Sequence, residues 1–227
     1  MVKNKPLVTV ITPTYNRGKD YLAETIESVL AQDYPNFEYL VLDDGSTDNT
    51  REVVSSYDDP RLQYYYHDNM GVIRTVNKGF KMANGEFVTV VNSDDPVLQG
   101  LLSRSVAFLQ ENLDVIGTYP DWIMIDQDSN PVKTIKVTEY NYIQALQDYR
   151  CFQGPGTIFR HKIFAQIGLY DPQFPTFFDF EFYMRAGMHG EFTRIPETLA
   201  QYRAHDNTIT SQSIPNIGNE FIDLYEK

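Results

Sequence analysis

The chain has 227 residues, a length typical of one domain, and 42% of them are hydrophobic, which excludes a fully disordered chain. With 31 acidic and 19 basic side chains, its net charge of −12 argues against nucleic acid or an anionic membrane surface as the main electrostatic partner. The single cysteine, Cys151, excludes an intrachain disulfide and a cysteine-rich zinc site.

The first 96 residues alternate apolar runs with segments of helical spacing. In chain order they predict a strand over 7–12, a helix over 21–32, a strand over 37–42, a helix over 47–57, a strand over 62–66, a helix over 73–84 and a strand over 86–91. Apolar strands that alternate with helices are typical of a buried parallel sheet with helices on its faces. We therefore expect an α/β fold.

The pattern is looser after residue 97, but strands and helices still alternate. It predicts a helix over 98–112, a strand over 115–122, a hairpin over 123–137, a helix over 140–148, a strand over 157–160, helices near Phe164 and over 180–189, and a strand over 195–203. Since no repeat or linker separates the two halves, we expect one compact domain with a shared sheet.

The sequence also bears on location. No stretch approaches the roughly 18 consecutive apolar residues of a membrane-spanning helix. The N-terminal residues lack the apolar core and cleavage site of a signal peptide. We therefore expect a cytoplasmic protein without a transmembrane segment.

Three polar clusters follow predicted strands: TPTYNR at 12–17, DDGSTD at 43–48 and NSDD at 92–95. The carboxyl ends of parallel strands meet at one edge of a sheet, and ligands of open α/β sheets bind at that edge. The sequence therefore places a candidate ligand site where these three clusters meet.

The acidic pair Asp94 and Asp95 is the first candidate for chemistry. Neighbouring carboxylates repel each other unless a cation or hydrogen bonds offset their charge. A divalent Mg or Mn ion bridging to a diphosphate would provide that charge, because such ions prefer oxygen ligands. The alternative is a solvated turn that caps the following helix.

The second acidic pair, Asp43 and Asp44, could accept hydrogen bonds from a nucleotide base or ribose. The alternative is a type I turn in which Ser46 or Thr47 caps the next helix. Arg74 could contact phosphate from the start of its helix, or be an ordinary exposed helix charge.

In their order and spacing, four motifs resemble family 2 glycosyltransferases, and the resemblance extends over essentially the whole chain. These motifs are TPTYNR at 12–17, LVLDDGSTDNT at 40–50, NMGVIRTVNKG at 69–79 and GEFVTVVNSDD at 85–95. The resemblance implies the GT-A fold, in which a Rossmann-like, mixed but mostly parallel sheet is flanked by helices. It also implies an inverting enzyme that uses nucleotide-activated sugars, with a UDP-type donor favoured.

For the donor base, the resemblance implies a pocket lined by Thr12, Pro13 and Tyr15, with Tyr15 stacking on the ring. Asp44 would read the base, and Asp43 would lie beside it.

For the phosphates, the resemblance implies that Arg74 approaches the base or diphosphate and that Asp94 holds ribose or metal. Asp95 would be the main ligand of a Mn or Mg ion, and His205, in the run YRAH, could be a second ligand. Asn92 stands where the family often has aspartate, so this chain has one carboxylate fewer there.

In the second half, Asp179 aligns with the family's catalytic base. Neighbouring phenylalanines would desolvate it and raise its pKa, which suits a general base. The alternative is that Asp179 caps the helix after it, in which case Glu181 would be the next candidate base.

The resulting hypothesis assigns 1–96 to nucleotide-sugar binding and 97–227 to acceptor binding and the catalytic base. The acceptor would be a saccharide or lipid-linked saccharide in surface polysaccharide or glycolipid synthesis, and peripheral membrane association is possible. The rival hypotheses are a sugar nucleotidyltransferase, which should carry a glycine-rich basic loop after the first strand, and a non-catalytic nucleotide-sugar-binding module.

Overall fold

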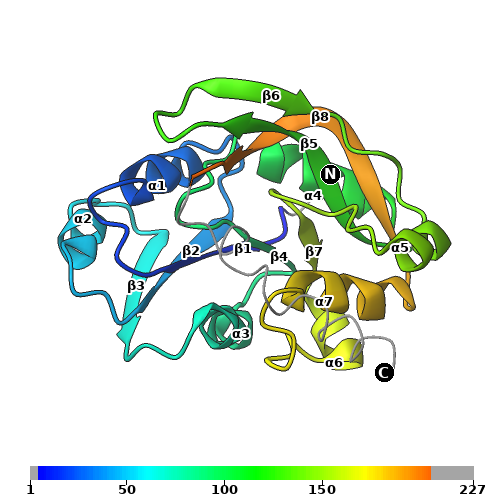
Figure 1. Ribbon diagram of the computed structural model, residues 1–227, viewed down its shortest axis with the longest axis horizontal. Helices are drawn as coiled ribbons and strands as arrows, with labels where there is room; N and C mark the ends of the chain where they lie inside the picture. Colours follow the sequence, from blue (N-terminus) through cyan, green and yellow to red (C-terminus); the bar gives the residue numbers. More distant parts are fainter. Residues whose placement is uncertain (1–4, 206–227) are drawn as a thin grey trace.

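One eight-stranded sheet extends through the computed structural model, which describes residues 5–205 of the chain (Figure 1). The strands lie in the order β3-β2-β1-β4-β7-β5-β6, and β8 pairs with β5 off this path. The elements in chain order are β1 (Val8–Thr14), α1 (Leu22–Leu30), β2 (Phe37–Asp44), α2 (Thr50–Ser55), β3 (Leu62–His67), α3 (Val72–Met82), β4 (Phe87–Val90), α4 (Leu101–Glu111), β5 (Val115–Ile125), β6 (Pro131–Ile135), α5 (Tyr142–Asp148), β7 (Ile158–Arg160), the short 3-10 helix η1 (His161–Ile163), α6 (Phe164–Ile167), α7 (Phe178–Gly187) and β8 (Glu191–Arg203).

The first four strands are all parallel, as their continuous apolar runs predict. β1 pairs with β2 and β4, and β2 pairs with β3. Every residue of β1 is buried, because helices cover both faces of the sheet there. The carboxyl ends of these strands therefore lie at one edge of the sheet.

Strands from the second half extend the same sheet and make it mixed. β7 is antiparallel to both β4 and β5, β6 is antiparallel to β5, and β8 is parallel to β5. The expectation of one shared, mostly parallel sheet is confirmed. The assignment of separate functions to 1–96 and 97–227 stays a prediction, and the last part of the second range lies outside the described residues.

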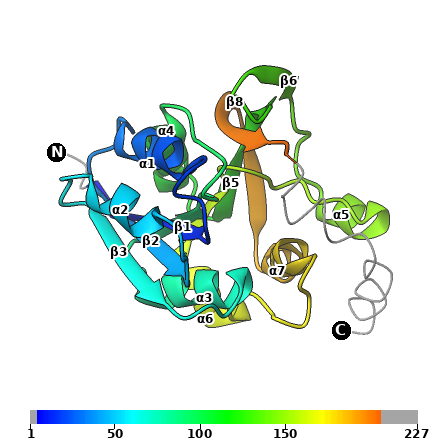
Figure 2. The same cartoon turned by 60° about the vertical axis from the view of Figure 1, so that its left-hand side comes forward.

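Side chains of alternate strand residues enter two cores on opposite faces of the sheet. In β2, Leu40 and Leu42 join the core under α3 and α7, whereas Tyr39 and Val41 join the core under α1 and α4. Figure 2 shows α1 and α4 on one side of the sheet and α3, α6 and α7 on the other.

Aromatic rings fill the first of these cores. Phe80 of α3 packs against Phe159, Phe164, Tyr170 and Phe182, with ring centroids 4.5 to 6.5 Å away. These rings join α3 to β7, α6 and α7, so the core links both halves of the sequence.

The largest differences from the expected boundaries occur in the second half. α7 begins at Phe178, not at residue 180, and two carboxylates in its first turn, Asp179 and Glu181, suit the positive end of the helix dipole. β8 begins at Glu191, because its early residues pair with β5 from Val115 onward.

None of the helices between residues 5 and 205 combines the length and apolar character needed to cross a bilayer.

We predict that Phe80→Ala lowers the free energy of unfolding by about 3 to 5 kcal/mol, the usual cost of removing a buried aromatic ring. Phe80 is only 1% exposed, so its removal leaves a cavity among the surrounding rings. Denaturant unfolding measures the change. Val132→Ala, at an exposed position of β6, is the control and should change stability by less than about 0.5 kcal/mol. Equal losses in the two variants would contradict the packing described.

Candidate active site

Hydrogen bonds join the loops that follow β1 and β2 at the carboxyl edge. The main-chain N–H of Asn16 donates to Ser46 Oγ at 2.8 Å, and Asn16 Oδ1 accepts from the N–H of Thr47 at 2.8 Å. Asn16 takes the left-handed conformation, with φ of 52°, that this reciprocal contact needs. Part of the TPTYNR and DDGSTD motifs therefore builds the loops of the site.

The two carboxylates at the end of β2 point to opposite faces and are both buried. Asp43 accepts from the N–H of Ser46 at 2.8 Å and from the hydroxyl of Tyr64 at 2.5 Å. Asp44 accepts from the N–H groups of Met70 and Gly71 at 2.7 and 3.0 Å. Asp44 thereby fixes the loop that leads into α3, and a base would have to bind its remaining lone pairs.

A glycine is required for steric reasons at position 45, in the loop after β2. Gly45 has φ of 83°, and a Cβ at this position would lie 2.8 Å from the main-chain nitrogen of Asn69. The side chain of Asn69 also donates to the carbonyl of Asp44 at 2.9 Å. Only glycine allows the loop after β2 to lie this close to the loop before α3.

The three residues expected to line the base pocket are not equally accessible. Thr12 is completely buried in β1 and its hydroxyl lies 3.0 Å from that of Tyr39, so the structure does not support a pocket-lining role for its side chain. Pro13 is also buried. Tyr15 is 51% exposed and available for stacking. Arg74 is exposed on α3, with Nη1 3.4 Å from the carbonyl of Met70.

Two polar atoms near this edge are buried without a hydrogen-bond partner in the described part of the chain. They are the hydroxyl of Thr14, at the end of β1, and Nε2 of His67, at the end of β3. Nδ1 of His67 lies 3.5 Å from Asp44 Oδ1. Thr14 belongs to the TPTYNR motif, but nothing in the sequence pattern indicated His67.

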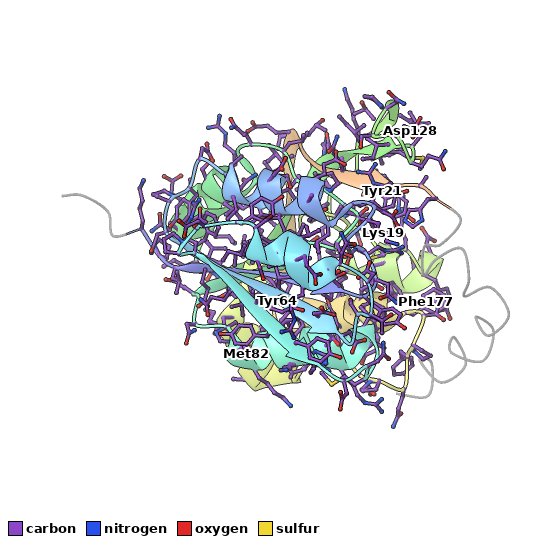
Figure 3. The ribbon with its side chains drawn as sticks, turned by 90° about the vertical axis from the view of Figure 1, so that its left-hand side faces the viewer. Lys19, Tyr21, Tyr64, Met82, Asp128 and Phe177 are labelled. Carbon is purple, nitrogen blue, oxygen red and sulfur yellow. The ribbon has the colours of Figure 1, made fainter. Side chains whose placement is uncertain are left out.

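A cavity of about 240 Å³ lies beside the end of β2, on the α2 side of the sheet. Its lining residues are Asp43, Ser46, Thr47, Asp48, Arg51, Glu52, Tyr64 and Tyr66. Arg51 lies against the rings of Tyr64 and Tyr66, 5.7 and 5.4 Å from their centroids. Figure 3 looks onto this face and labels Tyr64. Sequence reasoning did not identify Arg51 or these tyrosines.

The acidic turn after β4 gives its two aspartates different surroundings. Asp95 is only 6% exposed; its Oδ1 accepts from the N–H of Arg203 at 2.8 Å and its Oδ2 from Asn92 Nδ2 at 3.0 Å. Burial and the charge of Asp94 raise the pKa of Asp95 to about 7. Each oxygen of Asp95 already accepts one hydrogen bond from the protein, so Asp95 could bind a metal ion only through its remaining lone pairs, and its role as the main metal ligand stays a prediction.

Asp94 instead points toward two basic side chains. Its Oδ2 lies 3.0 Å from His205 Nε2 and 3.8 Å from Arg17 Nη2. The ring of His205 also packs against Tyr21, with centroids 5.3 Å apart. The structure therefore brings together the predicted residues Asp94 and His205 and adds Arg17, which the sequence did not single out.

The carboxylate of Asp94 is an oxygen ligand that suits Mn or Mg, and the imidazole of His205, 3.0 Å away, is a nitrogen ligand that Mn accepts more readily than Mg. Residues 5–205 contain no cluster of three or more His, Cys, Asp or Glu side chains that could hold a metal ion by itself. A divalent ion at Asp94 and His205 would therefore need further oxygen ligands from a bound diphosphate or water. The residues present fit such an ion.

Asp179 lies in the first turn of α7, partly buried. Phe177 occupies the N-cap position, so Asp179 is not the helix cap, and its Oδ1 accepts from the N–H of Phe180 at 2.7 Å. Burial raises the pKa of Asp179 above its usual value of 3.8 despite that hydrogen bond. Burial raises the pKa of Cys151 and of Tyr183, and the negative charge of Asp179 contributes to both shifts.

Glu181, the second candidate base, is held by an ion pair within α7. Its two oxygens accept from Arg185 Nε and Nη2 at 2.5 and 2.6 Å. The same guanidinium donates to the carbonyls of Ile167 and Leu169. Glu181 therefore anchors the loop before α7 and is poorly placed to accept a proton from substrate.

Comparison with known proteins identifies the family to which this fold and acidic edge belong. The model of glycosyl transferase family 2 matches residues 9–168, which is more than half of the chain, so the chain belongs to this family. It is 30% identical over 218 residues to an uncharacterized glycosyltransferase of Rickettsia typhi, covering 92% of this chain. It is 35% identical over 135 residues to the putative teichuronic acid biosynthesis glycosyltransferase TuaG of Bacillus subtilis, covering 58%.

Solved structures show the same architecture. Residues 1–349 of S. aureus TarS in complex with UDP-GlcNAc superpose with a TM-score of 0.76 at 25% identity, over 90% of this chain. The mannosyltransferase PcManGT of Pyrobaculum calidifontis, in complex with GDP-Man and Mn²⁺, gives 0.74 at 18% identity over 99% of this chain and supports the fold alone. The expected GT-A fold is confirmed.

The relatives are longer than this chain. The matched region spans 67% of the Rickettsia protein, 53% of TuaG and 60% of the TarS fragment.

We predict that Glu181→Gln lowers the free energy of unfolding by about 2 to 3 kcal/mol, because it leaves the Arg185 guanidinium without its counter-charge. Transfer activity per folded molecule should stay within about twofold of wild type, as expected for a structural ion pair. Thermal melting and initial rates, normalised to folded protein, measure the two effects. A rate loss of 100-fold or more without a loss of stability would make Glu181 the base, by the usual worth of general-base catalysis.

Proposed function

We propose that this chain is an inverting glycosyltransferase that moves a sugar from a nucleoside-diphosphate sugar to an acceptor hydroxyl. The observation that carries the proposal is the Asp94–His205 pair, 3.0 Å apart at the carboxyl edge of the sheet and close to Arg17. Family membership and the nucleotide-sugar complex of TarS support a sugar-nucleotide donor and favour a UDP type.

On the donor side, Asp94 and His205 would hold a Mn or Mg ion. Such an ion supplies positive charge that offsets the negative charge developing on the departing diphosphate. Arg17 adds a cation beside it, which matters in a chain with a net charge of −12. Asp95 stabilises the turn through its hydrogen bonds with Arg203 and Asn92. Tyr15 is the exposed aromatic side chain that would stack on the base.

On the acceptor side, Asp179 would be the general base. The acceptor oxygen attacks the anomeric carbon as the bond from that carbon to the diphosphate oxygen breaks, and the hydroxyl proton passes to Asp179. Attack opposite the leaving group inverts the anomeric centre without a covalent enzyme intermediate. The raised pKa of Asp179 supports this role, because a stronger base accepts the proton more readily.

For the acceptor we propose a saccharide or lipid-linked saccharide, in keeping with the printed role of TuaG in teichuronic acid biosynthesis. Work on a lipid-linked acceptor would place the protein in the cytoplasm at the inner face of the membrane. Incubation with UDP-, GDP- and dTDP-sugars in the presence of Mn tests the donor class. Absence of both transfer and slow donor hydrolysis with all three would contradict the proposal.

We predict that Asp94→Asn weakens Mn-dependent UDP binding at least tenfold, since it removes the charged oxygen ligand. The melting temperature without metal should change little, because Asp94 is less enclosed than Asp95. Titration calorimetry with and without Mn measures binding. Asp114→Asn, an exposed position before β5, is the control that removes the same charge. UDP binding that is unchanged in Asp94→Asn would reject the metal assignment.

We predict that Asp179→Asn reduces kcat by roughly two to four orders of magnitude, the usual worth of a general base. Donor binding and folding should be retained, because asparagine is nearly isosteric with aspartate. In wild type, transfer requires ionised Asp179. Its rate should therefore fall as the pH drops through the raised pKa, and the acid limb should lie above pH 3.8. Rates at saturating donor and acceptor across pH measure this. Full activity in Asp179→Asn would exclude Asp179.

A further inference from the structure

Only the main-chain N–H of Arg203, at the end of β8, has a part in the site as described so far, yet the guanidinium of this residue is completely buried. A buried cation is costly unless hydrogen bonds and a counter-charge compensate it. Arg203 must therefore be held by its surroundings, and those surroundings identify what it joins.

All three nitrogens of the guanidinium have acceptors, and they come from three separate parts of the chain. Nε donates to the carbonyl of Asp94 at 3.0 Å. Nη1 donates to the carbonyl of Asp126 at 3.0 Å and to Ser129 Oγ at 2.9 Å. Nη2 donates to Glu24 Oε2 at 2.6 Å. One side chain thus links the acidic turn, the tip of the β5–β6 hairpin and the first turn of α1.

The main-chain N–H of Arg203 and the ring of Tyr21 also hold the acidic turn and its neighbour His205 in place. The N–H of Arg203 donates to Asp95 Oδ1 at 2.8 Å, so Arg203 holds both aspartates of the turn. Its guanidinium lies over the ring of Tyr21 at 4.3 Å, and that ring also packs against His205. The two residues proposed to hold the metal are therefore both positioned by contacts with Arg203 or Tyr21.

Glu24 is the only carboxylate that pairs with this guanidinium among residues 5–205. It also accepts from Ser129 Oγ at 2.8 Å, and Ser129 has a left-handed φ of 64°. Figure 1 shows the hairpin tip and the end of β8 next to α1. Because Glu24 is 43% exposed, it can be substituted with much less risk to folding than Arg203.

We propose that Arg203, with Glu24 as its counter-charge, is a positioning residue for the donor site: it sets the orientation of Asp94 toward His205. It touches neither substrate nor metal and acts through the main chain of the acidic turn. This inference rests on the proposed function, because the orientation matters only if Asp94 and His205 hold the metal ion of a nucleoside diphosphate.

The test compares Glu24→Ala with Glu27→Ala, a variant that removes a carboxylate of equal charge one turn further along α1. Glu27 contacts the hydroxyl of Tyr57 at 3.2 Å and none of the groups around Arg203. Arg203→Lys is a second variant, which keeps the charge but has fewer donors. Electron paramagnetic resonance measures Mn(II) affinity with UDP present, and amide hydrogen exchange of residues 93–95 in metal-free protein measures order in the turn.

We expect Glu24→Ala to weaken Mn(II) binding about tenfold, as for loss of one charge-assisted hydrogen bond, and to speed amide exchange in the turn. Glu27→Ala should match wild type in both. Arg203→Lys, where it folds, should lose at least as much Mn(II) affinity as Glu24→Ala.

Wild-type Mn(II) affinity in folded Glu24→Ala would overturn the positioning role, even if that variant melts earlier, because a merely stabilising ion pair lowers only the melting temperature. Failure of the wild type to bind Mn(II) with UDP would instead overturn the proposed function, and that result is visible before any variant is compared.

Discussion

Four aspartates at one edge of a sheet repel each other, and the site depends on how the chain compensates their charge. Asp43, Asp44 and Asp95 accept hydrogen bonds from main-chain N–H groups, a tyrosine hydroxyl and an asparagine amide. These partners are built into the fold and cannot leave. Asp94 differs, because its carboxylate lies against two basic side chains, those of His205 and Arg17. Such side chains can move aside for a cation and a diphosphate more easily than the main chain can, and this favours Asp94 as the proposed metal ligand.

The elements could be predicted because the strands of a buried parallel sheet are continuous apolar runs and the helices have a regular apolar stripe. The same reasoning, applied to single residues, also accounts for the burial of Thr12. Strand residues alternate between faces, so Thr12 shares a face with Val8 and Val10, which belong to the core under α1 and α4. The exposed Tyr15 lies beyond the strand, where this alternation ends.

Contacts between distant residues could not be predicted from one sequence. Glu24 and Arg203 are 179 positions apart, and neither lies in a pattern that marks it as buried. The sequence pattern places Arg203 only at the end of a predicted strand, in the run YRAH, and a charged residue is normally expected at the surface. Its burial depends on the hairpin tip folding back onto α1. The loop geometry that decides this, including the left-handed Ser129, leaves no periodic signal.

The contacts of Arg203 also join the two halves of the chain at the acidic turn. The acidic turn follows β4, but the groups that orient it come from the end of β8 and the β5–β6 hairpin, on the acceptor side of the proposed division. Asn92 fits the same arrangement. An aspartate there would place a third carboxylate in the turn, whereas the amide donates to Asp95 and reduces the repulsion. The turn that would face the donor is thus held by groups from both halves, because the end of β8 contacts the carbonyl of Asp94 and the carboxylate of Asp95.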